Sequence, residues 1–324
     1  MTSPDISVIV LNYNGAAWLT PCLQALAAQQ DAPPFETIVV DNASRDGSAA
    51  LVRDRFSTVQ LIETDRNLGF AAGNNAGARG ARGTCLVFLN NDTVVASDWL
   101  ARLHAALTAG PGRDLVTSRL VRMDDPAVVD SAGDGYVRAG GAYKRGSGRR
   151  ADDYSRSEEV FGACGAAFMI RRAVFEELGG FDESFFMVYE DVDLSYRARL
   201  RGYRCWYAAD AIVRHAVSGT LGRRSAAAVF HGQRNLEWTW IKNTPRRLLA
   251  RTLVSHVVYS TAGLLHYARI GQLVPAARGK FAALSGLGRV LRARRAVQSS
   301  ARAADAVEVL MSRGWLALKR AEKR

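Results

Sequence analysis

The stretch LVFLNNDTVV, residues 86–95, decides the fold because it passes from an apolar run directly into three polar side chains. The apolar part is short and rich in β-forming residues, which predicts a buried strand. In open α/β sheets, ligands bind outside the carboxyl ends of the strands. Asn90, Asn91 and Asp92 stand at such an end, and the carboxylate of Asp92 is able to hold a cation there.

Three segments closer to the amino terminus have the same character: ISVIVL (6–11), TIVV (37–40) and VQLI (59–62). The stretches between them carry apolar residues at helical spacing. This alternation predicts an α/β fold with a mostly parallel central sheet. Polar residues again follow the first two strands, at Asn12, Asn14 and Asp41. Such residues also cap helices and form turns, but their recurrence after three strands favours a ligand site.

Two common nucleotide-binding signatures are missing from this pattern. No GxxxxGK[ST] occurs, and the first strand-to-helix junction reads LNYNGAAW and not GxGxxG. The sequence therefore lacks the main motifs that would indicate a P-loop enzyme or a nicotinamide oxidoreductase. Glycines instead recur every four residues in DRNLGFAAGNNAGARGARG (65–83). Their spacing allows either close approach of a ligand or tight packing of a helix on the sheet.

A second acidic cluster lies in FFMVYEDVDLSYR, residues 185–197. Glu190, Asp191 and Asp193 stand between aromatic residues and a basic helix. Crowding of like charges and partial burial raise the proton affinity of at least one member, which suits a general base. The alternative is a solvated acidic helix start, favoured by the helix dipole.

The positive charge of the chain is confined to its carboxyl-terminal part. Residues 241–324 hold 17 Lys and Arg against 3 Asp and Glu, a balance of +14, whereas the whole chain has +12. RRLLARTLVSHVVYSTAGLLHYARI (246–270) is apolar, helical in pattern and flanked by arginines. Its apolar core is at the short end for a membrane span, which favours an interfacial helix on an anionic membrane surface. A core helix with a solvated basic face is the alternative, and no fold motif supports a nucleic-acid partner.

Two further features concern the cellular compartment. The chain reaches its first apolar run without a basic leader segment, so no secretory signal is expected and a cytoplasmic location is predicted. The four cysteines are far apart and form no CxxC pair, which predicts free thiols in a reducing compartment: Cys22, Cys85, Cys164 and Cys205.

Seven motifs follow one another along the chain: LNYN, VVDNASRDGS, RNLGFAAGNN, FLNNDTVV, GACGAAFMIRR, LGGFDESFFMVYEDVDLSYRARLRGY and RHAVSGT. As an ordered set they resemble family 2 glycosyltransferases, most closely the bacterial rhamnosyltransferase-like branch that builds cell-surface polysaccharide. The resemblance implies a GT-A fold, a nucleoside diphosphate sugar as donor, a divalent metal, Mg²⁺ or Mn²⁺, and inversion at the anomeric carbon.

The resemblance also implies roles for individual residues. It makes Asp191 the catalytic base and Asp92 the metal ligand, with His215 completing the metal shell. Only one carboxylate is present in the NND segment, so metal affinity is expected to depend on the diphosphate. Because charge grows on the leaving phosphate, Arg197 or another arginine of residues 197–204 is also expected to assist it. The donor-binding residues are Asn12, Asn14, Asp41, Asn67, Gly69, Asn74, Asn91 and Asp92, and the acceptor side holds Asp182, Phe186 and Glu190.

The sequence thus predicts a GT-A catalytic domain at 1–243 and a basic helical tail at 244–324. Within the domain, the Gly-rich stretch 122–160 is expected to be a mobile loop that orders over donor or acceptor, with a plain surface excursion as the alternative. The expected activity is transfer of rhamnose or a related hexose from a dTDP- or UDP-sugar to a lipid-linked or polysaccharide acceptor, at the inner face of the plasma membrane. A catalytically silent nucleotide-sugar-binding protein or a membrane-associated scaffold is the alternative, and the tail could also pair protomers.

Overall fold

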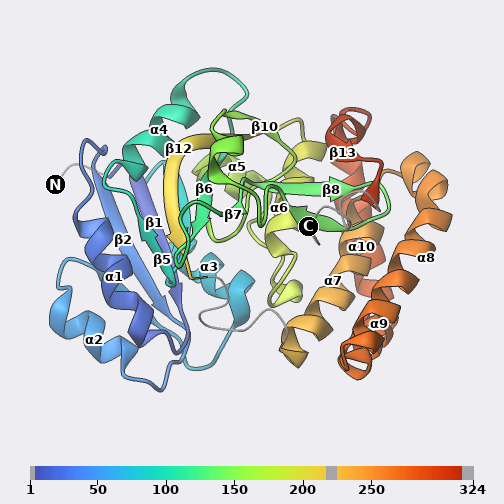
Figure 1. Ribbon diagram of the computed structural model, residues 1–324, viewed down its shortest axis with the longest axis horizontal. Coiled ribbons are helices and arrows are strands. Elements are labelled where there is room, and N and C mark those ends of the chain that lie inside the picture. The colour runs from blue at the N-terminus through green and yellow to red at the C-terminus, as the bar shows by residue number, and fades with distance from the viewer. Residues whose placement is uncertain (1–3, 217–224, 316–324) are drawn as a thin grey trace.

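The protein is described here by a computed structural model that covers residues 4–216 and 225–315, so residues 217–220 of RHAVSGT and residues 316–324 of the tail lie outside the described residues. Its centre is a ten-stranded sheet (Figure 1). The strands are β1 (Ile6–Asn12), β2 (Phe35–Asp41), β3 (Gln60–Glu63), β4 (Cys85–Asn90), β5 (Thr93–Val95), β6 (Leu115–Arg122), β7 (Val129–Ser131), β10 (Glu158–Val160), β11 (Ala167–Arg171) and β12 (Cys205–His215). The main path runs β10-β12-β6-β11-β4-β1-β2-β3, with β5 beside β12 and β7 beside β6.

The amino-terminal half of this sheet is parallel, as the sequence predicts. β1 pairs in parallel with β2 on one side and β4 on the other, and β3 extends β2 in the same direction. In this register Asn12 lies beside Asp41, and Leu11 lies beside Asn90. The polar residues that follow three separate strands therefore meet at one edge of the sheet.

Both faces of the sheet are covered, which explains why its strands are continuous apolar runs. Val8 and Val10 belong to the core under α1 (Ala16–Ala27), α2 (Ser48–Arg55) and α4 (Trp99–Thr108). Ile9, which points the other way, belongs to the core under α3 (Gly69–Gly80), α5 (Arg172–Glu177) and α6 (Glu190–Leu200).

The glycines of α3 allow that helix to lie directly on the sheet. A Cβ atom on Gly73 would come 2.5 Å from Leu11 Cδ1, and one on Gly77 would come 2.5 Å from Ile9 Cγ2. Atoms cannot approach so closely, so these two glycines serve helix-to-sheet packing.

The rest of the sheet is mixed, because β11 runs antiparallel between β4 and β6 while β12 runs parallel to β6. A small second sheet contains β13 (Met311–Ser312), β8 (Asp134–Val137) and β9 (Ala142–Lys144). The prediction of a mobile loop at 122–160 is therefore wrong. The segment forms β7 to β10 and a 3-10 turn, every residue of β8 is buried, and Tyr136 stacks on Phe161 with ring centroids 5.2 Å apart.

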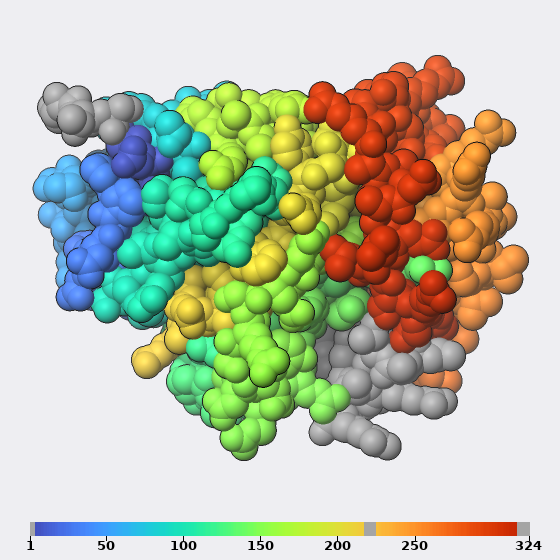
Figure 2. Space-filling view, turned by 90° about the horizontal axis from the view of Figure 1, so that it is seen from above, coloured from blue at the N-terminus to red at the C-terminus, as the bar shows by residue number. Residues whose placement is uncertain are grey.

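Four helices form the carboxyl-terminal end of the molecule, opposite α1 and α2 (Figure 1). They are α7 (Ala226–Asn243), α8 (Arg246–Arg269), α9 (Leu273–Ser285) and α10 (Leu287–Ser299). Figure 2 shows this part, orange to red, covering one end of the protein. The basic helical extension is thus present. α9 and α10 pack directly on α7, so division into domains at residue 243 stays a prediction.

Candidate active site

A cavity of about 540 Å³ lies at the carboxyl edge of β1 and β4. Its walls also include the start of α3, the residues before and at the start of α6, the ends of β9 and β12, and the start of α7. The structure therefore brings Asp92 and Asp191 from distant parts of the sequence to one cavity. The predicted site residues that line it are Asn67, Gly69, Asn91, Asp92, Phe186, Glu190, Asp191 and His215.

Asn12 and Asp41 lie behind this wall. Asn12 is fully buried, donates from Nδ2 to Asp41 Oδ1 at 2.9 Å, and accepts from Asn91 Nδ2 at 2.7 Å. Their position orients Asn91 toward the cavity, because a buried, fully bonded amide holds its neighbours in one arrangement. Asn14 is also outside the lining and accepts a hydrogen bond from the backbone of Arg45 at 2.8 Å.

The wall next to α3 is built around Asn42, which the sequence places among the polar residues after the second strand but not among the donor-binding residues. Its Nδ2 donates to Asn67 Oδ1 at 3.0 Å and to Gly69 O at 3.1 Å, and its Oδ1 accepts from Leu68 N at 2.8 Å. Asn74, by contrast, is buried away from the lining and donates to Phe70 O at 3.0 Å within its own helix. Asn42 directly follows Asp41 in the motif VVDNASRDGS, so its position at the end of a strand indicates a candidate site residue.

A chain of charged side chains runs from Asp92 to Lys144. His215 Nε2 lies 3.3 Å from Asp92 Oδ1, and His215 Nδ1 lies 2.9 Å from Asp130 Oδ2. Lys144 Nζ contacts the same Asp130 oxygen at 2.7 Å. Burial lowers the His215 pKa, but the hydrogen bond to Asp130 and the nearby charge of Asp92 outweigh burial and raise it. Burial likewise disfavours ionised Asp130, yet His215 and Lys144 hold its pKa well below its usual range.

The atoms around Asp92 fit a divalent cation in part. Asp92 Oδ1 is buried and makes no hydrogen bond, and carboxylate oxygen and imidazole nitrogen both bind metals. In residues 4–216 and 225–315, no three His, Cys, Asp or Glu side chains are grouped as a metal site. A cation held by Asp92 and His215 therefore needs further oxygen ligands, which a bound diphosphate can supply.

Two adjacent carboxyl groups begin α6 on another wall of the cavity. Asp191 Oδ2 accepts from Gly165 N at 2.7 Å, and Oδ1 accepts from Val192 N at 2.8 Å. Glu190 is 5% exposed, and its Oε2 makes no hydrogen bond. Burial, followed by the charge of Asp191, raises the pKa of Glu190 well above its ordinary value. Burial also raises the Asp191 pKa against the two backbone bonds, so the predicted increase in proton affinity is confirmed.

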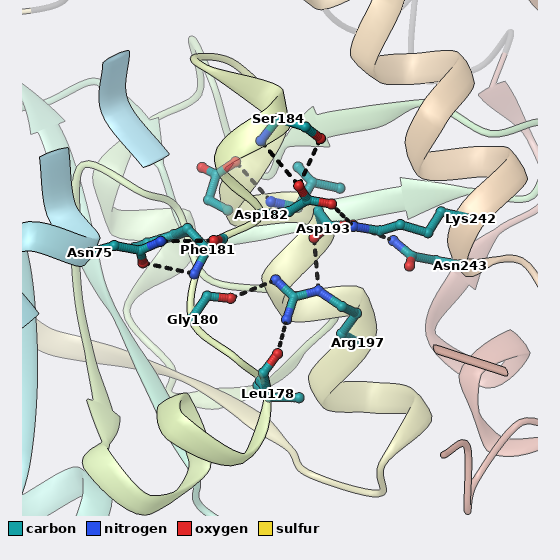
Figure 3. A network of polar contacts seen from close by, with 12 residues as sticks. Asn75, Leu178, Gly180, Phe181, Asp182, Ser184, Asp193, Arg197, Lys242 and Asn243 are labelled. Carbon is teal, nitrogen blue, oxygen red and sulfur yellow. Dashed lines mark hydrogen bonds and ion pairs between the residues drawn. The ribbon is translucent and has the colours of Figure 1, made fainter. Parts of the chain in front are cut away.

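Asp182 lies outside the cavity lining, in a buried network that fastens α6 to α7 (Figure 3). Its Oδ2 contacts Lys242 Nζ at 2.6 Å, and Lys242 also lies 2.7 Å from Asp193 Oδ1. Lys242 lowers the Asp182 pKa to about 2 in spite of burial, which raises it. The carboxylate of Asp182 is thus already bound by a cation within the protein.

The prediction that an arginine of residues 197–204 faces the leaving phosphate is not supported by their positions. Arg197 binds Asp193 at 2.8 Å and the carbonyls of Leu178 and Gly180, because it joins α6 to the preceding turn (Figure 3). No arginine lines the described part of the cavity, whereas Lys144 does. The position of Lys144 could not be predicted from the Gly-rich sequence around it, because the pairing of β8 with β9 places this residue at the cavity.

The sequence model of "Glycosyl transferase family 2" matches residues 7–179, more than half of the chain. The chain belongs to glycosyl transferase family 2. Among curated relatives, N-acetylglucosaminyl-diphospho-decaprenol L-rhamnosyltransferase of Mycobacterium tuberculosis is 27% identical over 245 residues, covering 68% of this chain and 79% of that protein. Glycosyltransferase AglE of Haloferax volcanii is 35% identical over 120 residues, but the match covers 36% of this chain and only 39% of that protein.

Solved structures support the GT-A fold of this family 2 member. Mannosyltransferase PcManGT from Pyrobaculum calidifontis, in complex with GDP-Man and Mn²⁺, has a TM-score of 0.56 at 22% identity, covering 95% of this chain and 87% of that one. GalNAc-T7 with UDP, GalNAc and Mn²⁺ has a TM-score of 0.57 at 17% identity, covering 73% and 48%. The resemblance stated from the sequence and the expected fold class are both confirmed.

Proposed function

We propose that this glycosyltransferase moves rhamnose or a related hexose from a dTDP- or UDP-sugar to a lipid-linked or polysaccharide acceptor, with inversion at the anomeric carbon. The supporting observation is that Asp92 and Asp191 line one cavity. Similarity to an enzyme named for L-rhamnosyl transfer to a diphospho-decaprenol lipid supports the choice of sugar and acceptor.

Asp191 is the proposed base. Its raised pKa brings it closer to neutral pH, where a base removes a hydroxyl proton effectively. The acceptor oxygen forms its bond to the anomeric carbon while its proton passes to Asp191. The bond from that carbon to the diphosphate breaks, and its electron pair leaves on the nucleoside diphosphate. The backbone N–H groups of Gly165 and Val192 fix the direction of the carboxylate.

The donor binds against the opposite walls in this proposal. Asp92 and His215 would hold Mg²⁺ or Mn²⁺, which supplies positive charge to the departing diphosphate. Lys144 adds a second cation, and its bond to Asp130 holds its ammonium group in place. Asn91, with Asn12 and Asp41 behind it, faces the ribose, while Asn42, Asn67 and Gly69 form the nucleoside wall.

The acceptor approaches past Phe186 and Glu190. Burial and the charge of Asp191 raise the Glu190 pKa well above its ordinary value, which favours the protonated carboxyl, the form that donates a hydrogen bond to an acceptor oxygen. A lipid-linked acceptor places the reaction at the inner face of the plasma membrane. Nucleic acid has no part in this proposal.

The experiment combines donors, acceptors and metal ions with the purified protein. Release of nucleoside diphosphate is measured with dTDP- and UDP-sugars plus Mg²⁺ or Mn²⁺, and NMR gives the anomeric configuration of the product. We expect metal-dependent release and an inverted product. A protein that binds donors but releases no diphosphate with any acceptor is instead the catalytically silent binding protein or membrane scaffold. A retained configuration would contradict the single displacement.

A further inference from the structure

Helix α8 exposes more large apolar side chains than a helix of a soluble protein usually does. Its buried residues are Leu248, Thr252 and His256. Its outer face, in contrast, consists of large apolar side chains that are each more than half exposed: Leu253, Val254, Val257, Val258 and Leu265. Their spacing of three, four and seven residues places them on one side of the helix. Exposed apolar stripes of this kind mark an interaction surface.

Polar contacts hold the inner side of α8 to the catalytic part. His256 Nδ1 lies 2.8 Å from Ala139 O, and His256 Nε2 lies 2.7 Å from Glu237 Oε2. The imidazole also stacks on Trp240 with ring centroids 3.7 Å apart. Although α8 is long and apolar enough to cross a membrane by length and composition, a spanning position would break these contacts. The structure therefore favours a helix that lies on a surface.

Charge identifies the partner of this face. Arg246 and Arg247 are exposed at the start of α8, and Arg269 is exposed at its end. Two copies of the chain meeting through α8 would bring together two tails of +14 each. An anionic lipid surface matches both features, since each cation near such a surface strengthens binding about fivefold and apolar side chains enter the headgroup boundary.

We propose that the outer face of α8 docks on an anionic membrane surface, with the helix parallel to that surface. The full chain is sedimented with vesicles of phosphatidylcholine alone or with phosphatidylglycerol added. We expect binding to the mixed vesicles, at least tenfold weaker binding to the neutral ones, and weakening by high salt. The pair Val254→Glu and Val258→Glu should reduce binding at least tenfold.

Ala50→Glu is the matched control, because Ala50 is exposed on α2 at the other end of the molecule (Figure 1). It should bind vesicles as the wild type does. If the double variant does not fold, Val254→Glu alone serves. Equal binding by wild type and the α8 variants would overturn the proposal. So would a wild-type dimer that α8 variants convert to monomers while neither binds vesicles. Lipid binding needs no sugar transfer, so this result is independent of the proposed function.

A separate observation concerns the segment before the catalytic pair. Phe186, Val188 and Tyr189 have φ angles of 63°, 66° and 79°. Such left-handed conformations are unfavourable for residues other than glycine, and most of all for a β-branched valine. Val188 and Tyr189 lead directly into Glu190. The backbone that places the two carboxyl groups is therefore strained, and contacts from elsewhere must hold it.

Asn235 of α7 supplies those contacts. Its side chain is fully buried, and Nδ2 lies 3.0, 2.9 and 2.6 Å from the carbonyl oxygens of Phe185, Met187 and Val188. The neighbouring Arg234 donates to Phe185 O at 2.8 Å. An unpaired buried carbonyl is costly, so these bonds oppose relaxation of the segment.

We infer that Asn235 is a positioning residue for the Glu190–Asp191 pair, an inference that rests on the proposed function for its effect on rate. Asn235→Ala should lower kcat roughly 10- to 100-fold. It should also speed hydrogen exchange of the Gly165 amide at least tenfold, because that amide bonds Asp191. Glycine is unstrained at positive φ. In a Val188→Gly background, the effects of Asn235→Ala on kcat and on Gly165 exchange should therefore both be smaller, by about 5- to 30-fold.

Hydrogen exchange keeps this test separate from catalysis. Unchanged exchange at Gly165 in Asn235→Ala, or equal losses with and without Val188→Gly, would overturn the positioning role. A changed exchange pattern in a protein that transfers no sugar would instead contradict the proposed function and leave the positioning role standing. Asn235→Ser, which keeps one donor, is the second variant if Asn235→Ala does not fold.

Discussion

Gly165→Ala perturbs the proposed base without altering its chemistry. An alanine Cβ at this position would lie 2.8 Å from Asp191 Oδ2 and 3.2 Å from Cγ. Since nonbonded carbon atoms rest roughly 3.5 Å apart, the carboxylate must move by about 0.5 Å. The Gly165 N–H bond to Asp191 then weakens, and a bond to a charged group contributes roughly 1.5–3 kcal/mol. That amount corresponds to about 1–2 pKa units.

The direction of the Asp191 pKa change depends on whether the Gly165 hydrogen bond stabilises the ionised or the protonated carboxyl. The Gly165 N–H stabilises ionised Asp191, so weakening it raises the Asp191 pKa further. We expect kcat to fall roughly 10- to 100-fold and the acidic limb of the pH–rate profile to move to higher pH.

The assay is nucleoside diphosphate release across about pH 5 to 9, with thermal unfolding measured alongside. Gly110→Ala is the matched control, because its added Cβ meets no atom within 4 Å. A folded Gly165→Ala enzyme with the wild-type rate and pH profile would refute the idea that the position of Asp191 sets the rate.

Three further predictions concern charged groups. Asp130→Asn should lower the His215 pKa, because the Asp130 bond raises it; NMR titration of the imidazole checks this, and an unchanged midpoint would contradict it. Lys144→Met should weaken donor binding about tenfold by calorimetry, with intact folding as the control. Burial raises the Glu237 pKa, but His256 and Lys280 lower it overall from 4.5 to about 2. Its stabilisation is therefore complete above pH 4.5 and lost as the pH falls toward 2, and Glu237→Gln should flatten that dependence in acid unfolding.

The strands β1, β2 and β4 could be predicted because burial on both faces makes each of them an apolar run. The polar residues at their ends could be located for the same reason. The sequence does not show which of two adjacent residues at a strand end faces the cavity, because adjacent residues of a strand point to opposite sides. The family resemblance implies a donor role for Asp41, whereas the structure places the adjacent Asn42 in the lining and Asp41 behind it.

Contacts between segments that are distant in the sequence could not be predicted from one sequence. Lys144 and Asp130 lie in a stretch that looked like a loop, and they reach the site only through pairing of short strands. Asn235 has no local signal, since its role depends on the strained backbone beside it. The exposed apolar stripe of α8 can also be recognised only when the inward side of the helix is known.

Asp191→Asn compared with Glu190→Gln tests the central claim most directly. Both changes keep the shape of the side chain, and donor binding and sugar transfer are measured for each. We predict that Asp191→Asn binds donor as the wild type does and transfers no sugar, whereas Glu190→Gln keeps measurable transfer with weaker use of acceptor. Transfer retained by Asp191→Asn and lost by Glu190→Gln would contradict the account.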